Sequence, residues 1–210
     1  MSEPGIDSFS YFLKGGRYYD LKEYGQSTII YARALSAQQD EKCYHNSANL
    51  DYMQGKFRKA IKKYSLATVI RPSFAMSYND WGCCLSNLGK YDEAILKFKR
   101  AIEINTNYTL SYLNWGLVLY WKKEDIDAEE SIEKGLRKSV LSKDLLLERY
   151  KLELSLVEER LAKAGNEEEK EFLKGRIDGY QWILELIPEK LKKFAEEDTT
   201  EESDASDEGW

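Results

Sequence analysis

The chain of 210 residues is poor in cysteine, histidine and proline, with three, one and three of each. Cys43, Cys83 and Cys84 are odd in number and two are adjacent, which excludes a disulfide framework and leaves no CxxC pair for zinc. His45 has no histidine or cysteine near it in metal-ligand spacing, so we expect no metal site. The scarcity of proline leaves long stretches able to be helical.

Long apolar runs are also missing. No stretch reaches the roughly 18 apolar residues that a membrane-spanning helix needs, so we expect no membrane insertion. The first ten residues contain Glu3 and Asp7 but no basic residue, and they therefore lack the features of a secretory signal. These absences predict a cytoplasmic protein.

The net charge of −6 conceals a strongly acidic C-terminus. Residues 196–210 contain no base and eight acids, which leaves +2 for the rest of the chain. This segment has no apolar periodicity, so we expect a disordered tail that ends at Trp210. A body so close to neutral lacks the basic stripe of a nucleic-acid-binding protein.

What the sequence does contain is a repeat. Ala60, Ala94 and Ala128 are 34 residues apart, twice in succession. Further columns keep the same step: Tyr44, Tyr78 and Tyr112; Ala48, Gly82 and Gly116; Ala67, Ala101 and Gly135. A fixed period of this length predicts stacked copies of one small structural unit.

Each unit has the pattern of two helices joined by a tight turn. In the third unit, apolar residues at helical spacing predict helices over 75–88 and 91–104, with Gly89 ending the first. We expect Gly82 to face Ala94 where the two helices meet. The register gives four units, at about 8–40, 41–74, 75–108 and 109–142, after an N-terminal extension over 1–7.

The repeat resembles the tetratricopeptide repeat (TPR) family most closely at Trp81-Gly82, Gly89, Tyr91, Ala94, Phe98 and Ala101-Ile102-Glu103-Ile104. The resemblance implies an all-α, right-handed superhelical solenoid that binds proteins and is neither an enzyme nor dependent on a cofactor. Only Pro72 supplies the proline that ends a repeat in this family, and Asp125 replaces an aromatic residue of the other units.

Two longer helices are predicted after the repeats, over about 143–195. An apolar stripe from Leu173 to Phe194 steps by four and three residues, and Pro188 should kink or restart its helix. The two helices are expected to form a hairpin that caps the solenoid, or a diverged fifth repeat. Alternatively, the stripe is partly exposed and drives homo-oligomerisation or docks a partner helix.

In TPR proteins the first helix of each unit lines a concave groove, and this resemblance identifies the candidate partner-binding residues. They are Phe12, Tyr19, His45, Asn46, Asn49, Tyr52, Asn79, Asp80, Asn87, Leu113, Asn114, Leu117, Tyr120 and Trp121. A row of asparagines can bracket the N–H and C=O groups of an extended peptide. The same asparagines could instead be solvated or hydrogen-bond neighbouring repeats, and the C-terminal hairpin could cover the fourth-unit residues.

The leading functional hypothesis is a non-enzymatic scaffold that holds a peptide or helix in this groove. The alternative is a dedicated chaperone or assembly factor for a secretion or multi-subunit apparatus, which could self-associate. The positions that clamp a peptide carboxylate in chaperone-binding TPR domains lack positive charge here, and Asp80 would repel a carboxylate. A nucleophile–base pair, a metal cluster and a phosphate loop are all missing from the sequence, which argues against an enzyme.

Overall fold

The computed structural model describes residues 8–37, 40–139 and 141–207, and within them it contains helices and no strand. The first eight helices form four pairs: α1 (Ser8–Asp20) with α2 (Tyr24–Ala37), α3 (Glu41–Met53) with α4 (Phe57–Ile70), α5 (Ala75–Asn87) with α6 (Tyr91–Ile104), and α7 (Thr109–Trp121) with α8 (Asp125–Arg137). Two longer helices follow, α9 (Lys143–Lys163) and α10 (Glu167–Asp207).

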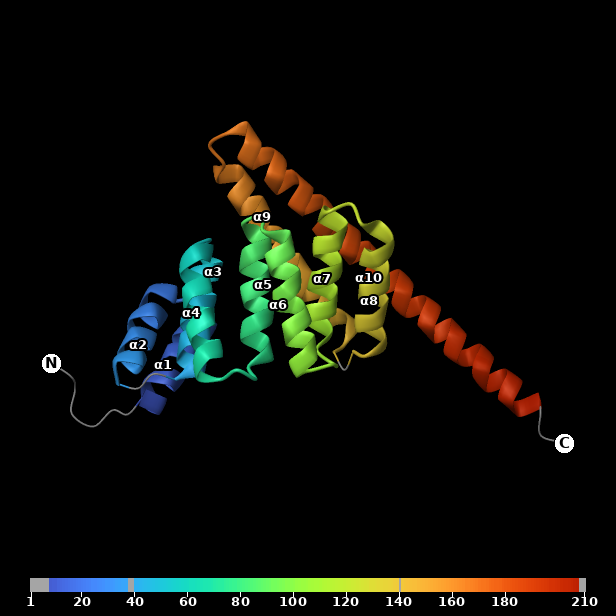
Figure 1. The fold of residues 1–210 in the computed structure, drawn as a ribbon, viewed down its shortest axis with the longest axis horizontal. Coiled ribbons are helices and arrows are strands. Elements are labelled where there is room, and N and C mark those ends of the chain that lie inside the picture. The colour runs from blue at the N-terminus through green and yellow to red at the C-terminus, as the bar shows by residue number, and fades with distance from the viewer. Residues whose placement is uncertain (1–7, 38–39, 140, 208–210) are drawn as a thin grey trace. The chain divides into compact units, whose positions relative to one another are not determined.

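The chain divides into two compact units, residues 1–114 and 115–210, and the boundary falls within α7. In the first unit, α1 packs on α2, α3 on α4 and α5 on α6, and each hairpin contacts the next through α2 with α3 and α4 with α5 (Figure 1). The predicted all-α fold of paired repeat helices is confirmed, and α5 and α6 begin and end within one residue of the predicted positions.

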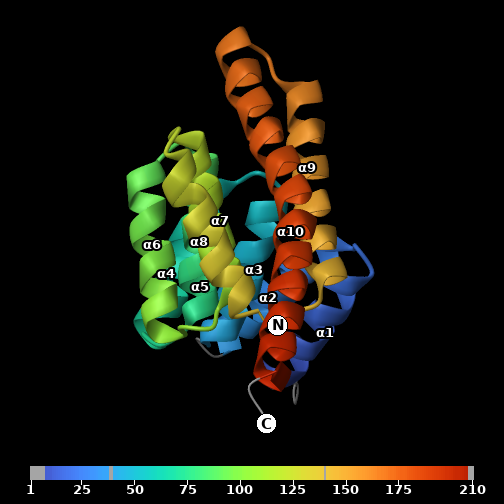
Figure 2. The ribbon, with the colours of Figure 1, turned by 90° about the vertical axis from the view of Figure 1, so that its right-hand side faces the viewer.

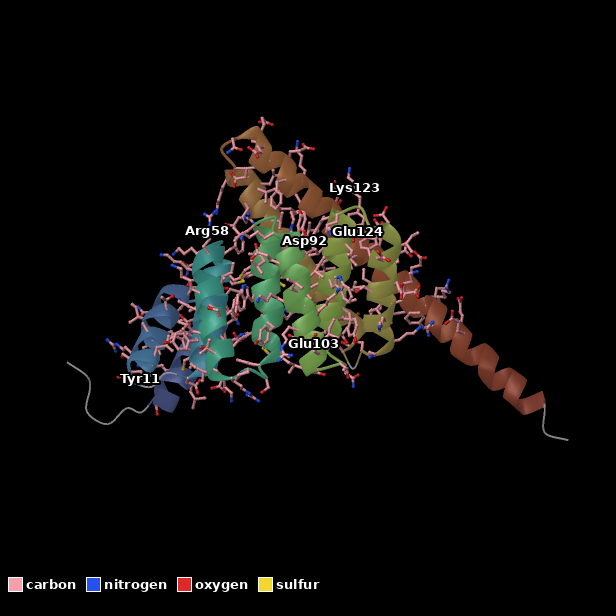
Figure 3. All side chains as sticks on the ribbon, viewed as in Figure 1. Tyr11, Arg58, Asp92, Glu103, Lys123 and Glu124 are labelled. Carbon is pink, nitrogen blue, oxygen red and sulfur yellow. The ribbon has the colours of Figure 1, made fainter. Side chains whose placement is uncertain are left out.

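The turns between paired helices share one backbone conformation. Gly55 and Gly89 have positive φ angles of 70° and 73°, in the left-handed region that glycine adopts at low cost. Lys22 and Lys123 occupy the equivalent turns with φ angles of 59° and 62°. The turn after Lys123 leads through Glu124 into α8 (Figure 3). The turns at Lys22 and Lys123 therefore keep the backbone conformation of the glycine turns, although a residue with a Cβ adopts it at a higher energy.

Small residues allow the paired helices to approach closely. Ala60, Ala94 and Ala128 are all fully buried. Gly82 lies against the ring of Phe98, and a Cβ added there would be 2.6 Å from a ring carbon. The atoms nearest to this added Cβ belong to Phe98, one turn further along α6 than the predicted neighbour Ala94.

The second unit contains the predicted C-terminal hairpin, in which α9 and α10 run side by side (Figure 2). Asn166 caps α10, because its Oδ1 accepts a hydrogen bond from the backbone N–H of Glu169 at 2.8 Å. Of the two outcomes predicted for Pro188, a kink or a restart, the helix does not restart there, because α10 runs through it as one element. Because α10 is about twice as long as α9, its C-terminal part continues past the N-terminus of α9 (Figure 1).

The structure contradicts the prediction of a disordered tail from residue 196, because α10 continues to Asp207. Its extension is supported by ion pairs one turn apart, Lys192 with Glu196 and Lys193 with Glu197. Glycine and proline, which end helices, are both missing from residues 189–207, so helical hydrogen bonding propagates despite the acidic composition. Trp210 lies outside the described residues.

The apolar stripe of α10 is used within the second unit. Leu173, Tyr180, Ile187 and Phe194 are buried, and Ile177, Leu184 and Leu191 between them are half-buried. This arrangement fits the prediction of a packed hairpin better than that of an exposed association surface. In the parts of the chain that the structure describes, no helix combines the length and apolar character needed to cross a membrane.

Candidate binding surface

Three polar side chains from the first helices of adjacent repeats lie close together and remain partly exposed. They are Asn46 and Asn49 of α3 and Asp80 of α5. Asn46 donates to the hydroxyl of Tyr31 at 2.9 Å, and the hydroxyl of Tyr64 donates to Oδ1 of Asn49 at 2.6 Å. These contacts hold both amides from the buried side, while each side chain stays partly exposed.

Asp80 is held in a similar way. Its Oδ1 accepts a hydrogen bond from Nδ2 of Asn79 at 2.9 Å, and its side chain is 17% exposed. Met76 lies one turn before Asp80 on α5, and Met53 lies one turn after Asn49 on α3. Met76 is 47% exposed and Met53 is half-buried. Asn46, Asn49, Asp80, Met53 and Met76 together are called the candidate binding surface below.

His45 lies beneath this surface and joins its parts. It is 4% exposed, and its Nδ1 is 2.9 Å from Oγ of Ser77. Its Nε2 is 3.4 Å from Nδ2 of Asn49 and 3.6 Å from the carboxylate of Asp80. Burial lowers the pKa of His45 below its usual value of 6.5, and the nearby Asp80 carboxylate opposes part of that shift.

Ser77, His45 and Asp80 are residue types that some hydrolases use together, and the sequence analysis did not identify this trio. Ser77 is fully buried, so its hydroxyl cannot reach a substrate. The ring of His45 is packed between the rings of Tyr64 and Phe74, with centroids 5.4 and 5.1 Å away. The trio therefore links α3 to α5 and supports Asp80 and Asn49 from below.

Comparisons with known proteins agree with this architecture. Residues 75–108 match the family model described as tetratricopeptide repeat. Among solved structures, MamA is 19% identical, with a TM-score of 0.59 over 62% of this chain and 77% of its own. One unit of the chain thus matches a tetratricopeptide repeat, and the paired helices share the fold of TPR solenoids.

Two further structures share the TPR fold. YrrB, described as a TPR protein with an unusual peptide-binding site, is 19% identical, with a TM-score of 0.56 over 63% of this chain and 69% of its own. The OM64 TPR domain of Arabidopsis is 20% identical, with a TM-score of 0.51 over 53% of this chain and 93% of its own. At these identities the likeness concerns the fold alone. No curated protein matches the sequence.

Three of the asparagines predicted to bind a partner connect helices instead. Asn79 is fully buried, and its Oδ1 accepts hydrogen bonds from Ser111 at 3.1 Å and from Asn114 at 3.0 Å. Asn87 is buried and donates to the hydroxyl of Tyr52 at 3.3 Å. Their assignment as peptide contacts is corrected, because Asn79 and Asn114 bond each other between α5 and α7, and Asn87 bonds Tyr52 of α3.

Tyr120 and Trp121 also have partners within the chain, as the hypothesis of a covering hairpin proposed. The ring of Tyr120 stacks on Trp182 of α10 with centroids 4.4 Å apart. The guanidinium of Arg176 lies 3.4 Å from the centroid of the Trp121 ring and donates to the hydroxyl of Tyr180 at 2.9 Å. These two residues therefore pack against α10, and both are half-buried.

The remaining predicted site residues fall into three groups. Leu113 and Leu117 are buried, which corrects the expectation that they form an exposed apolar contact site. Tyr19 and Tyr52 are half-buried and make edge-to-face contacts with Tyr24 and Phe57. The side chain of Phe12 lies outside the described residues.

Several residues that shape the site could not have been identified from the repeat pattern. Tyr31 and Tyr64 occupy the same repeat position as Phe98, so the pattern predicts only that their rings lie in the core. Their hydroxyl groups also hydrogen-bond Asn46 and Asn49 and hold these side chains in place. Arg176 lies outside the apolar stripe of α10, so its sequence position predicts an exposed charge. In the structure the side chain is buried.

Proposed function

We propose that this TPR protein is a non-enzymatic scaffold that binds a peptide or helix of a partner protein along the candidate binding surface. The observation that carries the proposal is the arrangement of Asn46, Asn49 and Asp80. Each is held from the buried side by a hydrogen bond and remains partly exposed. Amides can bond both the N–H and the C=O groups of a peptide backbone. Because their positions are already fixed, less conformational entropy is lost on binding.

The chemistry of the surface indicates which peptides it would prefer. Asp80 presents a partly exposed carboxylate, which favours a lysine or arginine in the peptide. Met53 and Met76 flank the polar centre, and methionine side chains adapt to apolar groups of different shapes. The description of YrrB as having a peptide-binding site lends support to this use of the fold.

Selection from a random displayed peptide library tests the proposal without a known partner. The selected peptides should share a basic residue, and the Asp80→Asn variant should select peptides without that preference. Asn46→Ala should lower the affinity for the selected peptides about tenfold, as expected when one hydrogen bond to the peptide is lost. Asn107→Ala, in the exposed turn before α7, is the matched control and should bind as the parent does.

Equal binding by Asp80→Asn, Asn46→Ala and the parent would overturn the proposal. The stoichiometry of natural complexes then separates two uses of the same surface. Weak, exchangeable binding to several proteins indicates a scaffold, whereas one client that co-purifies at fixed stoichiometry indicates a dedicated chaperone.

A further inference from the structure

The outward face of α4 differs from the equivalent faces of α6 and α8. Residues 52–79 contain no acid and six bases, Lys56, Arg58, Lys59, Lys62, Lys63 and Arg71, in a protein whose net charge is negative. Arg58, Lys59 and Lys62 are exposed on α4, and Arg58 projects from its first turn (Figure 3). The structure shows no acidic partner for Lys59 or Lys62 among the residues that it describes.

Exposed aliphatic side chains continue the same stripe. Lys59, Lys62, Leu66 and Val69 are spaced by three, four and three residues, which places them on one face of α4. Leu66 is 44% exposed and Val69 is 76% exposed. The face therefore presents cations in its first half and apolar groups in its second half.

The repeat itself provides the comparison. The four equivalent positions of α6 are Glu93, Leu96, Arg100 and Glu103, and those of α8 are Asp127, Glu130, Lys134 and Arg137. On α6 these charges are paired on the surface, Lys90 with Glu93 at 2.6 Å and Arg100 with Glu103 at 2.8 Å. Faces of mixed charge are an ordinary solvated surface, whereas a face with two cations followed by two exposed aliphatic groups indicates a contact site.

A segment with complementary chemistry is present in the same chain. After Glu197, the sequence contains six more acids and no base, and it ends in Trp210. Glu197 is tied to α8 through Arg137 at 2.7 Å, and α10 continues from there for ten residues, about 15 Å at the rise of a helix. The stripe from Lys59 to Val69 begins with cations and ends with apolar groups, and residues 198–210 begin with acids and end with Trp210. A parallel alignment of the two segments would therefore pair the acids with Lys59 and Lys62, and Trp210 with Leu66 and Val69.

We infer that the acidic C-terminal segment, residues 198–210, of one copy docks on the α4 face of a second copy. Each chain then offers one donor segment and one acceptor face, so the contact closes a reciprocal dimer or extends a chain. This surface is on a different helix from the candidate binding surface, so self-association and peptide binding can be tested separately. The attraction between exposed charges should weaken as salt is raised.

Sedimentation velocity of the full chain over a wide concentration range at low salt tests the inference. The parent should associate, and Lys59→Glu with Lys62→Glu should weaken association at least tenfold. Lys151→Glu with Lys174→Glu changes the net charge equally on exposed positions of α9 and α10 and should leave association unchanged. Circular dichroism shows whether each variant retains its helix content.

A charge exchange makes the test specific. The variant Glu201→Lys with Glu202→Lys should not self-associate, but it should associate when mixed with the Lys59→Glu, Lys62→Glu chain. A parent that stays monomeric at every concentration overturns the inference, as does failure of the mixed variants to associate. An equal loss of association in the Lys151, Lys174 control also overturns it, because the effect would then follow net charge alone.

Discussion

Replacing Gly82 with alanine tests how closely the repeat helices pack. A Cβ at this position would lie 2.6 Å from one Phe98 ring carbon and 2.9 Å from two others, about 1 Å inside normal contact distance. Phe98 is 1% exposed, so its ring has no open space to move into. Overpacking a rigid core of this kind costs about 1–3 kcal/mol.

The same substitution also removes the helix-propensity penalty of glycine, about 1 kcal/mol, and a control is needed to separate the two effects. Gly175 in α10 is exposed with nothing within 4 Å of an added Cβ, so Gly175→Ala should stabilise the protein by about 0.5–1 kcal/mol. The free energy of unfolding, measured by urea denaturation with circular dichroism, should differ between the two variants by about 1–3 kcal/mol. Adding Phe98→Leu should recover part of the loss at Gly82. Equal stabilisation by both alanines would refute the close packing of Gly82 on Phe98.

Three other predictions concern stability. Lys123→Gly should raise the free energy of unfolding by about 0.5–1 kcal/mol, because glycine adopts φ 62° without strain, and Gly89→Ala should lower it by a similar amount; urea denaturation measures both. The pKa of His45 is lowered in the folded state, so the unfolded state binds its proton first; stability should fall as the pH drops below about 6.5, and a thermal melt of His45→Asn should show a smaller fall. Lys190 joins Glu129 and Glu133 at 3.0 and 2.7 Å, so Lys190→Met should cost about 1 kcal/mol at low salt and less at high salt, whereas an equal loss at both would contradict an ionic contribution.

The repeat made most of the fold predictable. The 34-residue spacing of Ala60, Ala94 and Ala128 predicted the helix pairs, because small residues recur wherever two helices must approach closely. The sequence also identified the cap at Asn166 and the turn at Gly89. It did not reveal that Lys22 and Lys123 would adopt the glycine conformation, since the surrounding helices impose that geometry on the turn.

The candidate site was less predictable, because the register shows which side of a helix a residue occupies but not what lies opposite. Asn46 and Asn79 both belong to first helices, yet one is partly exposed and the other is fully buried between α5 and α7. The tail was predicted wrongly for a related reason. Composition suggested disorder, whereas contacts of α10 with α8 through Arg137 stabilise the helix from which the acidic residues continue.

The most direct test of peptide binding along α3 and α5 is a nuclear magnetic resonance titration of the full chain with a selected basic peptide. If the peptide binds there, backbone amide shifts should change most around Asn46, Asn49 and Asp80, with little change around Lys59 on α4. Shifts concentrated on α4 or α10, with the amides of α3 and α5 unmoved, would contradict it.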